Sequence, residues 1–426
     1  MSYLRKVLLL LGDSLMYLAA VFAVLALRFG WPIPHDVVQA HRMPFALLYV
    51  LWVIILYVYN LYDAKYARPT TQATRNILLG IGTCLLAGFL LFYLVPSSVT
   101  PKTNLLLLVG IFGGLFFVWR LCFFRIFTNN FKTTVATIGI SKEISEFTHE
   151  ILKNPHLGYQ ILGSFTTLRE ILSKETKPDM VVYESHLSSG DIALLAGTHV
   201  RGLHVRDAFQ IILYRIPVAL VDDTLALRIM EKSQNILYRG VTRLLEILFA
   251  LVLLIVALPF LIIASLAILF EDGGPIFYRQ DRVGIRGKVF RIIKLRSMRV
   301  GAESNGAKWA DKKDQRVTKV GHILRVSHLD EVPQMLNVLR GDIALVGPRP
   351  ERPEFVTTLE QEIPYYFLRH IIKPGFTGWA QIMFRYARSV MDSQEKFEYD
   401  LYYIKNRGFF LDIGIILKTV QIIFLH

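Results

Sequence analysis

Residues 327–350 read SHLDEVPQMLNVLRGDIALVGPRP, and two adjacent carboxylates, Asp330 and Glu331, stand just ahead of Pro333 in this stretch. Proline is favoured at the first position of a helix, and the following segment can stay helical until Gly341, a residue typical of helix ends. The pattern therefore predicts a short helix that begins at Pro333. Both acids would lie at its positive end, where anions are stabilised and phosphates commonly bind.

The same residues also fit a capping box, because Ser327 precedes Asp330 by three positions. A helix that began at Ser327 would carry Pro333 in its interior, at a cost of about 3 kcal/mol. We therefore favour the later start, which leaves both carboxylates available for chemistry.

The composition indicates a membrane protein with an acidic partner. The chain has 426 residues, enough for two or three domains, and 53% of them are hydrophobic. Mean hydropathy is +0.41, yet the formal net charge is +14. This charge suggests anionic lipid, a nucleotide or a lipid phosphate as partner, and the apolar segments favour these over nucleic acid. Cys84 and Cys122 both lie in apolar runs and support neither a disulfide framework nor a metal site.

Four apolar segments open the chain, and each is close to the ~20 residues that span a bilayer. We expect a four-helix transmembrane bundle over residues 1–130. Basic residues precede the first segment and lie between the second and third. The positive-inside rule therefore places the N-terminus, the 62–76 loop and everything after residue 127 in the cytoplasm, although Arg28 and Arg42 weaken this assignment. The apolar segments cover residues 7–27, 45–61, 77–95 and 105–127.

Residues 131–235 read as a separate α/β domain. Residues 134–140 and 180–183 have the pattern of buried strands, and residues 144–152 and 168–172 that of short helices. The first strand is followed by Gly-Ile-Ser-Lys-Glu and not by a Gly-x-Gly-x-x-Gly turn, so dinucleotide binding is not expected. We predict a structural or regulatory spacer.

A fifth apolar run, residues 247–270, differs from the first four because Pro259 interrupts it. A crossing helix should have most basic residues on one side only, whereas both flanks of this run are basic. We therefore favour a re-entrant helix over residues 244–270 that kinks at Pro259 and returns to the cytoplasm. The alternative is a fifth crossing, which would place the acid pair outside the cell. The flanking basic residues are Arg239, Arg243, Arg279, Arg282, Arg286 and Lys288.

We expect the fifth apolar run and the rest of the chain to form one domain over residues 236–426. The part after this run is basic and of mixed α/β character. Its last segment, residues 408–425, is apolar apart from Asp412 and Lys418 and a few other polar residues. An interfacial helix and an ordinary core helix both fit this pattern.

Several basic residues accompany the acid pair. Lys294 and Arg296 follow a strand-like segment, Arg325 precedes the acids by five residues, and Arg349 stands between two prolines. Each alone is usually a solvated surface charge. Together they suit phosphoryl transfer, in which cations neutralise the phosphate while carboxylates hold Mg²⁺ or attack phosphorus. A carboxylate is ionised at neutral pH and can act as a nucleophile without a partner base.

From about residue 238 to the C-terminus the chain resembles the bacterial sugar transferases, the monotopic polyprenyl-phosphate phosphoglycosyl transferases. The N-terminal half is similar to the larger members, which add four membrane helices and a degenerate, Rossmann-like nucleotide-fold domain. His328 departs from the pattern, because a small residue is common at this position. The matching blocks are GPIFYRQDRVG (274–284), KLRSM (294–298), DQRVTKVG (314–321), LDEVPQ (329–334), VGPRP (346–350) and KPGFTGW (373–379).

The resemblance implies a reaction through a covalent intermediate. Asp330 would attack the sugar-bearing phosphate of a UDP-sugar, UMP would leave, and polyprenyl phosphate would take the phosphosugar. Glu331 would bind Mg²⁺, and Arg325 would act in catalysis. The substrate-binding residues that the motifs imply are Lys294, Arg296, Arg349, Asp314 and Arg316.

The resemblance also implies a bacterial inner-membrane enzyme with a cytoplasmic catalytic domain, in contact with inner-membrane lipids and not with nucleic acid. Its product would initiate exopolysaccharide, capsule or O-antigen assembly. The sugar stays open between glucose, galactose and an N-acetylated sugar, and so does the oligomeric state, with a homodimer as one option.

Two rival functions fit less well. A membrane-bound nucleotide-sugar dehydratase would need a Gly-rich dinucleotide loop and a Tyr-x-x-x-Lys pair, and the sequence contains neither. A membrane scaffold or sensor would leave the acid pair and its basic companions unexplained.

Overall fold

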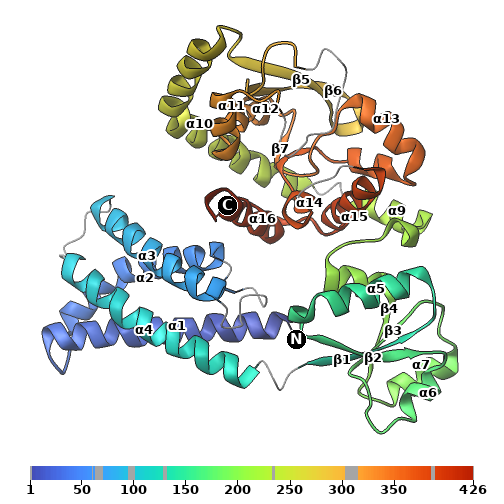
Figure 1. Ribbon diagram of the computed structural model, residues 1–426. Coiled ribbons are helices and arrows are strands. Elements are labelled where there is room, and N and C mark those ends of the chain that lie inside the picture. Colours follow the sequence, from blue (N-terminus) through green and yellow to red (C-terminus); the bar gives the residue numbers. More distant parts are fainter. Residues whose placement is uncertain are drawn as a thin grey trace. The chain divides into compact units, whose positions relative to one another are not determined.

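The computed structural model describes residues 2–59, 61–62, 71–94, 101–127, 132–232, 236–302, 315–384 and 389–425. Residue contacts divide the chain into two compact units, Met1–Ala208 and Phe209–His426, and each is described by itself (Figure 1). This division lies earlier in the chain than the predicted boundary at residue 235, because residues 209–232 pack with the C-terminal unit. There the Ile216 amide donates to the Glu398 carbonyl at 3.1 Å, and Arg215 pairs with the Glu398 carboxylate at 3.2 Å.

Four long helices begin the first unit, and each corresponds to one predicted apolar segment. Leu48, Trp52 and Phe116 are fully buried between them, whereas large apolar side chains such as Leu15 and Leu86 are exposed. Helices suit a lipid environment because their backbone groups are paired within the segment. With α10, described below, the described part of the chain holds five helices long and apolar enough to cross a membrane. The four helices are α1 (Ser2–Phe29), α2 (His35–Val58), α3 (Thr71–Leu94) and α4 (Pro101–Phe127).

One buried ion pair joins α1 to α4 inside this bundle. Arg120 donates to Asp13 at 2.6 Å and to the Leu61 carbonyl at 2.5 Å, and its guanidinium lies over the rings of Tyr62 and Phe116. Charged groups in apolar helix bundles are tolerated where they pair with one another and with backbone carbonyls. The pair therefore fixes how α1 and α4 pack.

A four-stranded parallel sheet with strand order β2-β1-β3-β4 follows the bundle. The two predicted strands correspond to β1 and β3, and the two predicted helices to α5 and α6. The sequence pattern missed β2, in which residues alternate between partly buried and exposed, and β4, which has four residues. Figure 1 shows α5 on one face of the sheet and α6 and α7 on the other. The elements are β1 (Thr133–Ile138), α5 (Lys142–Lys153), β2 (Tyr159–Phe165), α6 (Leu168–Leu172), β3 (Met180–Tyr183), α7 (Ser189–Ala196), β4 (Arg201–His204) and α8 (Val205–Ala208).

The second unit is a mixed α/β domain with two small sheets. Strands β5 and β6 form an antiparallel hairpin, and β7 and β8 form a parallel pair. Phe397 and Leu401 of α15 belong to the same buried cluster as Met335 and Val338 of α12, which anchors the segment after the acid pair in the core. The elements are α9 (Asp223–Lys232), α10 (Ile236–Asp272), β5 (Phe277–Val283), β6 (Val289–Leu295), α11 (Lys319–Val326), α12 (Met335–Arg340), β7 (Ala344–Val346), α13 (Pro353–Glu362), β8 (Gly375–Thr377), α14 (Trp379–Met383), α15 (Val390–Asn406) and α16 (Phe409–Leu425).

The C-terminal helix α16 has a buried face and an exposed apolar end. Ile415 is fully buried in the core of the unit, and Asp412 accepts a hydrogen bond from the Tyr403 hydroxyl at 2.9 Å. Phe410, at the start of the same helix, is almost fully exposed. Of the two predicted alternatives, an interfacial helix and a core helix, the core helix therefore describes the buried face of α16.

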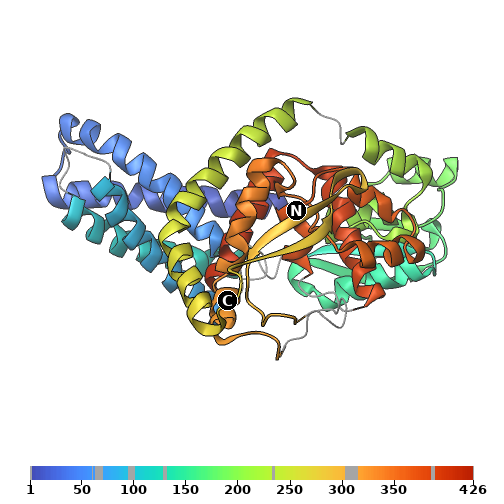
Figure 2. The same cartoon turned by 90° about the horizontal axis from the view of Figure 1, so that it is seen from above.

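Helix α10 contains the predicted re-entrant segment and carries Pro259 in its interior. Its ribbon bends along its length, as Figure 2 shows. Near its start, Arg243 donates to the carbonyls of Val338 and Leu339 at the end of α12, at 2.6 and 2.8 Å. At its other end, Glu271 accepts from the first amides of α11, that of Lys319 at 2.8 Å. Both ends of α10 are therefore tied to the same α/β domain.

Candidate active site

The acid pair lies inside a tight helical turn. Leu329–Gln334 form a 3₁₀ helix with Asp330 and Glu331 in its first turn, and α12 begins at Met335 and ends at Gly341 with a left-handed φ of 87°. The predicted helix start at Pro333 is therefore wrong, although the predicted end at Gly341 is confirmed. The 3₁₀ turn closes with i→i+3 bonds, the first from the Glu331 amide to the His328 carbonyl at 3.2 Å, and so begins before the proline.

The capping-box alternative is also excluded. Ser327 follows the last residue of α11, and its hydroxyl donates back to the Ile323 carbonyl at 2.9 Å. Between α11 and the 3₁₀ turn, His328 has a φ of 55°, in the left-handed region that a residue with a Cβ rarely adopts. This costs about 1–2 kcal/mol. The fold therefore holds a strained residue two positions before Asp330.

Glu331 is the centre of a charge cluster. Its Oε1 accepts from Lys294 Nζ at 2.7 Å and from Arg349 Nη2 at 2.6 Å, and Arg349 Nη1 lies 3.5 Å from Oε2. Lys294 comes from β6 and Arg349 from the loop after β7, so three segments distant in sequence meet at one carboxylate. Burial alone would raise the pKa of Glu331, but Arg349 and Lys294 hold it well below its usual range. Glu331 is therefore ionised at neutral pH.

Asp330 has a different environment. It is 8% exposed, and its carboxylate accepts no hydrogen bond from the residues that the structure describes. Burial and the neighbouring Glu331 charge raise its pKa to about 6, against the opposing effect of Lys294, Arg325 and His328. The carboxylate is mostly ionised at neutral pH but more basic than an ordinary aspartate, and its oxygens are free. These are the properties of a nucleophile.

Arg325 and Ser297 complete the surroundings of Asp330. Arg325 Nε donates to the Ser297 hydroxyl at 2.9 Å, which joins α11 to the segment after β6. A Cβ at Gly321 would lie 2.0 Å from the Ser297 carbonyl oxygen, so glycine is required for α11 to approach this segment. The structure thus brings together four predicted residues, Asp330, Glu331, Lys294 and Arg349, and orients Arg325 toward them.

The remaining predicted substrate-binding residues are not gathered with these. Arg296 is buried, and its guanidinium pairs with Asp272 at the end of α10. It therefore helps to hold α10, and its contact with substrate stays a prediction. Arg316 donates to the Ala302 carbonyl at 3.3 Å. Asp314 lies outside the described residues.

Asn337 is a positioning residue that the sequence analysis missed. This fully buried side chain of α12 accepts from the Ile293 amide at 3.0 Å and donates to the Arg291 carbonyl at 2.8 Å. Both contacts are to β6, next to Lys294. Asn337 therefore fixes the strand that carries Lys294 against the helix that follows the acid pair.

A second missed group holds the loop that carries Arg349. Arg369 Nη2 donates to the Arg349 carbonyl at 2.8 Å, and Arg282 Nη1 donates to the Pro350 carbonyl at 2.9 Å. Both arginines lie near Glu351, at 3.6 and 4.0 Å, and Glu351 accepts from Lys396 at 2.6 Å.

Arg369 is a buried member of this group, which we call the loop-holding network. Its residues are Arg282, Glu351, Arg369, Lys396 and Asp400. Arg369 Nε pairs with Asp400 of α15 at 2.8 Å, and its Nη1 donates to the Tyr366 hydroxyl at 2.8 Å. Arg369 and Asp400 are almost completely buried. The network therefore fixes the backbone from which Arg349 reaches Glu331.

The donor set fits a magnesium ion completed by substrate. Mg²⁺ is usually held through one or two carboxylates together with substrate phosphates and water. Asp330 and Glu331 are adjacent hard-oxygen ligands, and the Asp330 oxygens are not engaged by hydrogen bonds among the described residues. The described residues contain no cluster of three or more His, Cys, Asp or Glu side chains that could hold a metal ion. A magnesium ion at this position would therefore need further ligands from substrate and water.

Comparison with known proteins assigns the site to a family. The family model described as bacterial sugar transferase matches residues 237–426. A putative undecaprenyl-phosphate N-acetylgalactosaminyl 1-phosphate transferase of Bacillus subtilis is 47% identical over 132 residues, 31% of this chain and 74% of that protein. The chain belongs to the bacterial sugar transferase family.

Larger relatives extend this match into the N-terminal half. The UDP-glucose:undecaprenyl-phosphate glucose-1-phosphate transferase of Xanthomonas campestris is 30% identical over 334 residues, 69% of this chain and 68% of that protein. The UDP-N-acetylgalactosamine-undecaprenyl-phosphate N-acetylgalactosaminephosphotransferase of Aeromonas hydrophila is 36% identical over 232 residues. This second match covers 54% of the present chain and 54% of the Aeromonas protein, so the chain spans about half of that protein's length.

Proposed function

We propose that this bacterial sugar transferase moves a sugar 1-phosphate from a UDP-sugar to polyprenyl (undecaprenyl) phosphate. The observation that carries the proposal is the buried Asp330 carboxylate, free of hydrogen bonds among the described residues and adjacent to a glutamate that two cations neutralise. Basic groups around a carboxylate nucleophile suit attack on a diphosphate, because they offset the charge that repels it. The names of the relatives support this class of donor and acceptor.

The reaction would proceed in two displacements at one phosphorus atom. An Asp330 oxygen attacks the sugar-bearing phosphorus, the bond from that phosphorus to the bridging oxygen breaks, and UMP leaves with the bond electrons. A phosphate oxygen of the polyprenyl acceptor then attacks the same phosphorus and displaces Asp330. The products are the polyprenyl diphosphate sugar and the regenerated carboxylate.

Lys294, Arg349 and Arg325 would stabilise the phosphate charge during both displacements. In the free protein Glu331 holds Lys294 and Arg349, so their positions are set before the substrate arrives. Pre-positioned charges lower a barrier because they need no rearrangement at the moment of reaction. Glu331 would bind Mg²⁺, which when bound would neutralise the charge of the diphosphate.

Helix α10 would enter the membrane and return to the same side. Arg243 and Glu271 are 28 positions apart, about 42 Å along a straight helix, whereas the hydrocarbon core is about 30 Å thick. A domain folded on one side of a bilayer cannot hold both ends of a helix that crosses it. The contacts at both ends of α10 therefore support re-entry, with the catalytic unit at the cytoplasmic face of the inner membrane.

The sugar and the final glycan stay open. The relatives include proteins named for glucose and for N-acetylgalactosamine. A lipid-linked sugar of either kind would initiate polysaccharide assembly. We further propose that the α/β domain predicted over residues 131–235 has a degenerate, Rossmann-like fold without a bound nucleotide.

Turnover with a panel of UDP-sugars tests the proposal. Purified protein, polyprenyl phosphate and Mg²⁺ would be incubated with radiolabelled UDP-glucose, UDP-galactose or an N-acetylated analogue, and the lipid fraction counted. At least one donor should label the lipid and release UMP. Release of UDP, or of no product from any donor, would contradict the proposed reaction.

A further inference from the structure

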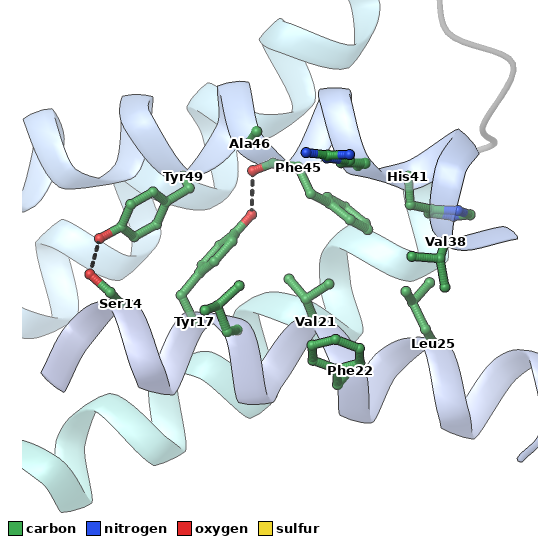
Figure 3. Close-up of a pocket in the computed structure, with 12 residues that line it drawn as sticks. Ser14, Tyr17, Val21, Phe22, Leu25, Val38, His41, Phe45, Ala46 and Tyr49 are labelled. Carbon is green, nitrogen blue, oxygen red and sulfur yellow. Dashed lines mark hydrogen bonds between the residues drawn. The ribbon is translucent and has the colours of Figure 1, made fainter. Parts of the chain in front are cut away.

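A pocket lies between α1 and α2 in the first unit, and none of its lining residues belongs to the candidate active site. Its volume is about 330 Å³, at the lower end of the range for small-molecule sites. Figure 3 shows Val21 and Leu25 of α1 facing Val38 and Phe45 of α2 across it. The pocket is therefore a cavity within the helix bundle.

The polar groups on its wall are already paired. The Tyr17 hydroxyl donates to the Phe45 carbonyl at 2.8 Å, and the hydroxyls of Ser14 and Tyr49 bond each other (Figure 3). His41 Nδ1 bonds the Val37 carbonyl at 2.8 Å. Because these groups are satisfied and the other wall residues are chiefly apolar, the interior suits a hydrocarbon.

The mouth of the pocket opens onto an apolar surface. Leu18 and Phe22 line the pocket, yet both are about half exposed, and Leu15 beside them is exposed as well. In a helix apolar enough to cross a membrane, such a surface faces lipid. A lipid chain would enter directly from the bilayer, whereas a water-soluble ligand would have to cross hydrocarbon first.

One charged residue, Arg42, lines the pocket about one turn along α2 from Val38. It is exposed, and it forms no hydrogen bond or ion pair with any part of the chain that the structure describes. Arg28, by contrast, donates to Asn104 at 2.6 Å. Asp36 precedes Arg42 by six positions on α2, about 9 Å along the axis, and is rotated from it by about one-third of a turn. Arg42 is thus an uncompensated cation, and guanidinium groups pair well with phosphate.

The length of the pocket matches one leaflet. Its lining on α1 runs from Ser14 to Leu25, eleven positions apart or about 16 Å along the helix. This is about half of the ~30 Å hydrocarbon core. An acyl chain of a lipid in one leaflet would fill it, and the long Arg42 side chain can extend along the pocket toward a headgroup at the Val38 end. A polyprenyl chain would extend well beyond the opposite end.

We propose that this pocket binds one acyl chain of an anionic phospholipid whose phosphate pairs with Arg42. The binding needs neither donor nor acceptor, so it does not depend on the proposed catalytic function. It would give α1 and α2 a specific lipid partner within the membrane.

Native mass spectrometry of the full-length protein in detergent tests whether the pocket prefers a lipid with an anionic headgroup. The probes are phosphatidylglycerol and phosphatidylcholine with identical acyl chains, added in turn. Arg42→Gln should lower the retained ratio of phosphatidylglycerol to phosphatidylcholine about fivefold, since a basic side chain contributes roughly that factor to anionic-lipid attraction. Arg42→Lys should keep most of the preference. Arg125→Gln, which removes an exposed arginine of α4, is the matched control and should leave the ratio unchanged.

The binding site of the acyl chain is tested with two Val→Phe substitutions. Val21→Phe fills the pocket and should remove one retained lipid with either headgroup, whereas Val50→Phe, on the exposed surface of α2 outside the pocket, should not. Equal lipid retention by the two variants would overturn the pocket as the site. An unchanged ratio in Arg42→Gln would overturn the phosphate contact, and because Arg42 is exposed this variant is expected to fold.

Discussion

Replacing Asp400 by asparagine removes one buried charge and almost no volume. Asp400 and Arg369 lie 2.8 Å apart with side chains 1% and 3% exposed, so the substitution leaves the Arg369 guanidinium partly uncompensated in the protein interior. Removing one partner of a buried pair typically costs about 3–5 kcal/mol. Glu351, 3.6 Å from Arg369, remains and places the expected cost at the lower end, about 3 kcal/mol. For a unit of this size that is a fall in melting temperature of at least about 6 °C.

The matched control is Asp281→Asn in the exposed hairpin β5–β6. Asp281 pairs with Arg291 at 3.2 Å, but both side chains are more than half exposed, so this pair should contribute less than about 1 kcal/mol. The assay is thermal unfolding of both variants and wild type in the same detergent, together with the KM for the UDP-sugar. Because Arg369 also donates to the Arg349 carbonyl, Asp400→Asn should raise that KM, and Asp281→Asn should not. Equal melting temperatures for the two variants would refute the account of the network that holds the loop.

Three further results follow from the site and from α10. The pKa of Asp330 is raised to about 6, so the folded state binds this proton more tightly than the unfolded chain, and ionisation of Asp330 destabilises the fold as pH rises from about 4 through 6. Asp330→Asn should therefore be more stable than wild type at pH 7.5, by on the order of 3 kcal/mol, and this advantage should vanish near pH 4; a pH-independent difference would contradict the argument. EDTA should abolish turnover and Mg²⁺ restore it, while full activity in chelator would exclude the magnesium proposal. With Cys84 and Cys122 replaced, Gly240→Cys and Ile285→Cys should both resist an impermeant maleimide in intact cells and react after the membrane is opened; labelling of the 285 site alone from outside would mean a true crossing.

Much of the site was predictable because its residues lie in short ordered motifs. The spacing of Asp330, Glu331 and Pro333 predicted a helix start beside the two acids, and the companion cations Lys294 and Arg349 do meet Glu331. The details of the turn were not predictable from the proline alone, because its preference for the first helical position does not distinguish an α helix from a 3₁₀ turn that began earlier. The pairing of Arg296 with Asp272 was not predictable for another reason. Arg296 stands two residues after Lys294, beyond the end of β6, and reaches Asp272 at the end of α10.

The ion pairs of the loop-holding network could not be predicted from a single sequence, because their partners lie far apart in it. Arg369 meets Asp400 across 31 positions and Glu351 meets Lys396 across 45, and nothing in their local sequence distinguishes them from surface charges. Their role follows from burial, which depends on how α15 packs against the Tyr366–His370 turn. Strands β2 and β4 were missed because neither forms a continuous buried run. The packing of segment 209–232 with the C-terminal unit was not predictable, because its partner, Glu398, lies some 180 residues later.

Intact-protein mass spectrometry tests the central claim most directly. Wild-type protein incubated with a UDP-sugar and Mg²⁺, but without polyprenyl phosphate, should gain the mass of one sugar phosphate, and peptide mapping should place it on Asp330. Addition of polyprenyl phosphate should remove the adduct. Asp330→Asn should show no adduct at any time. An adduct on the asparagine variant, or lipid-linked product formed by that variant at the wild-type rate, would contradict Asp330 as the nucleophile.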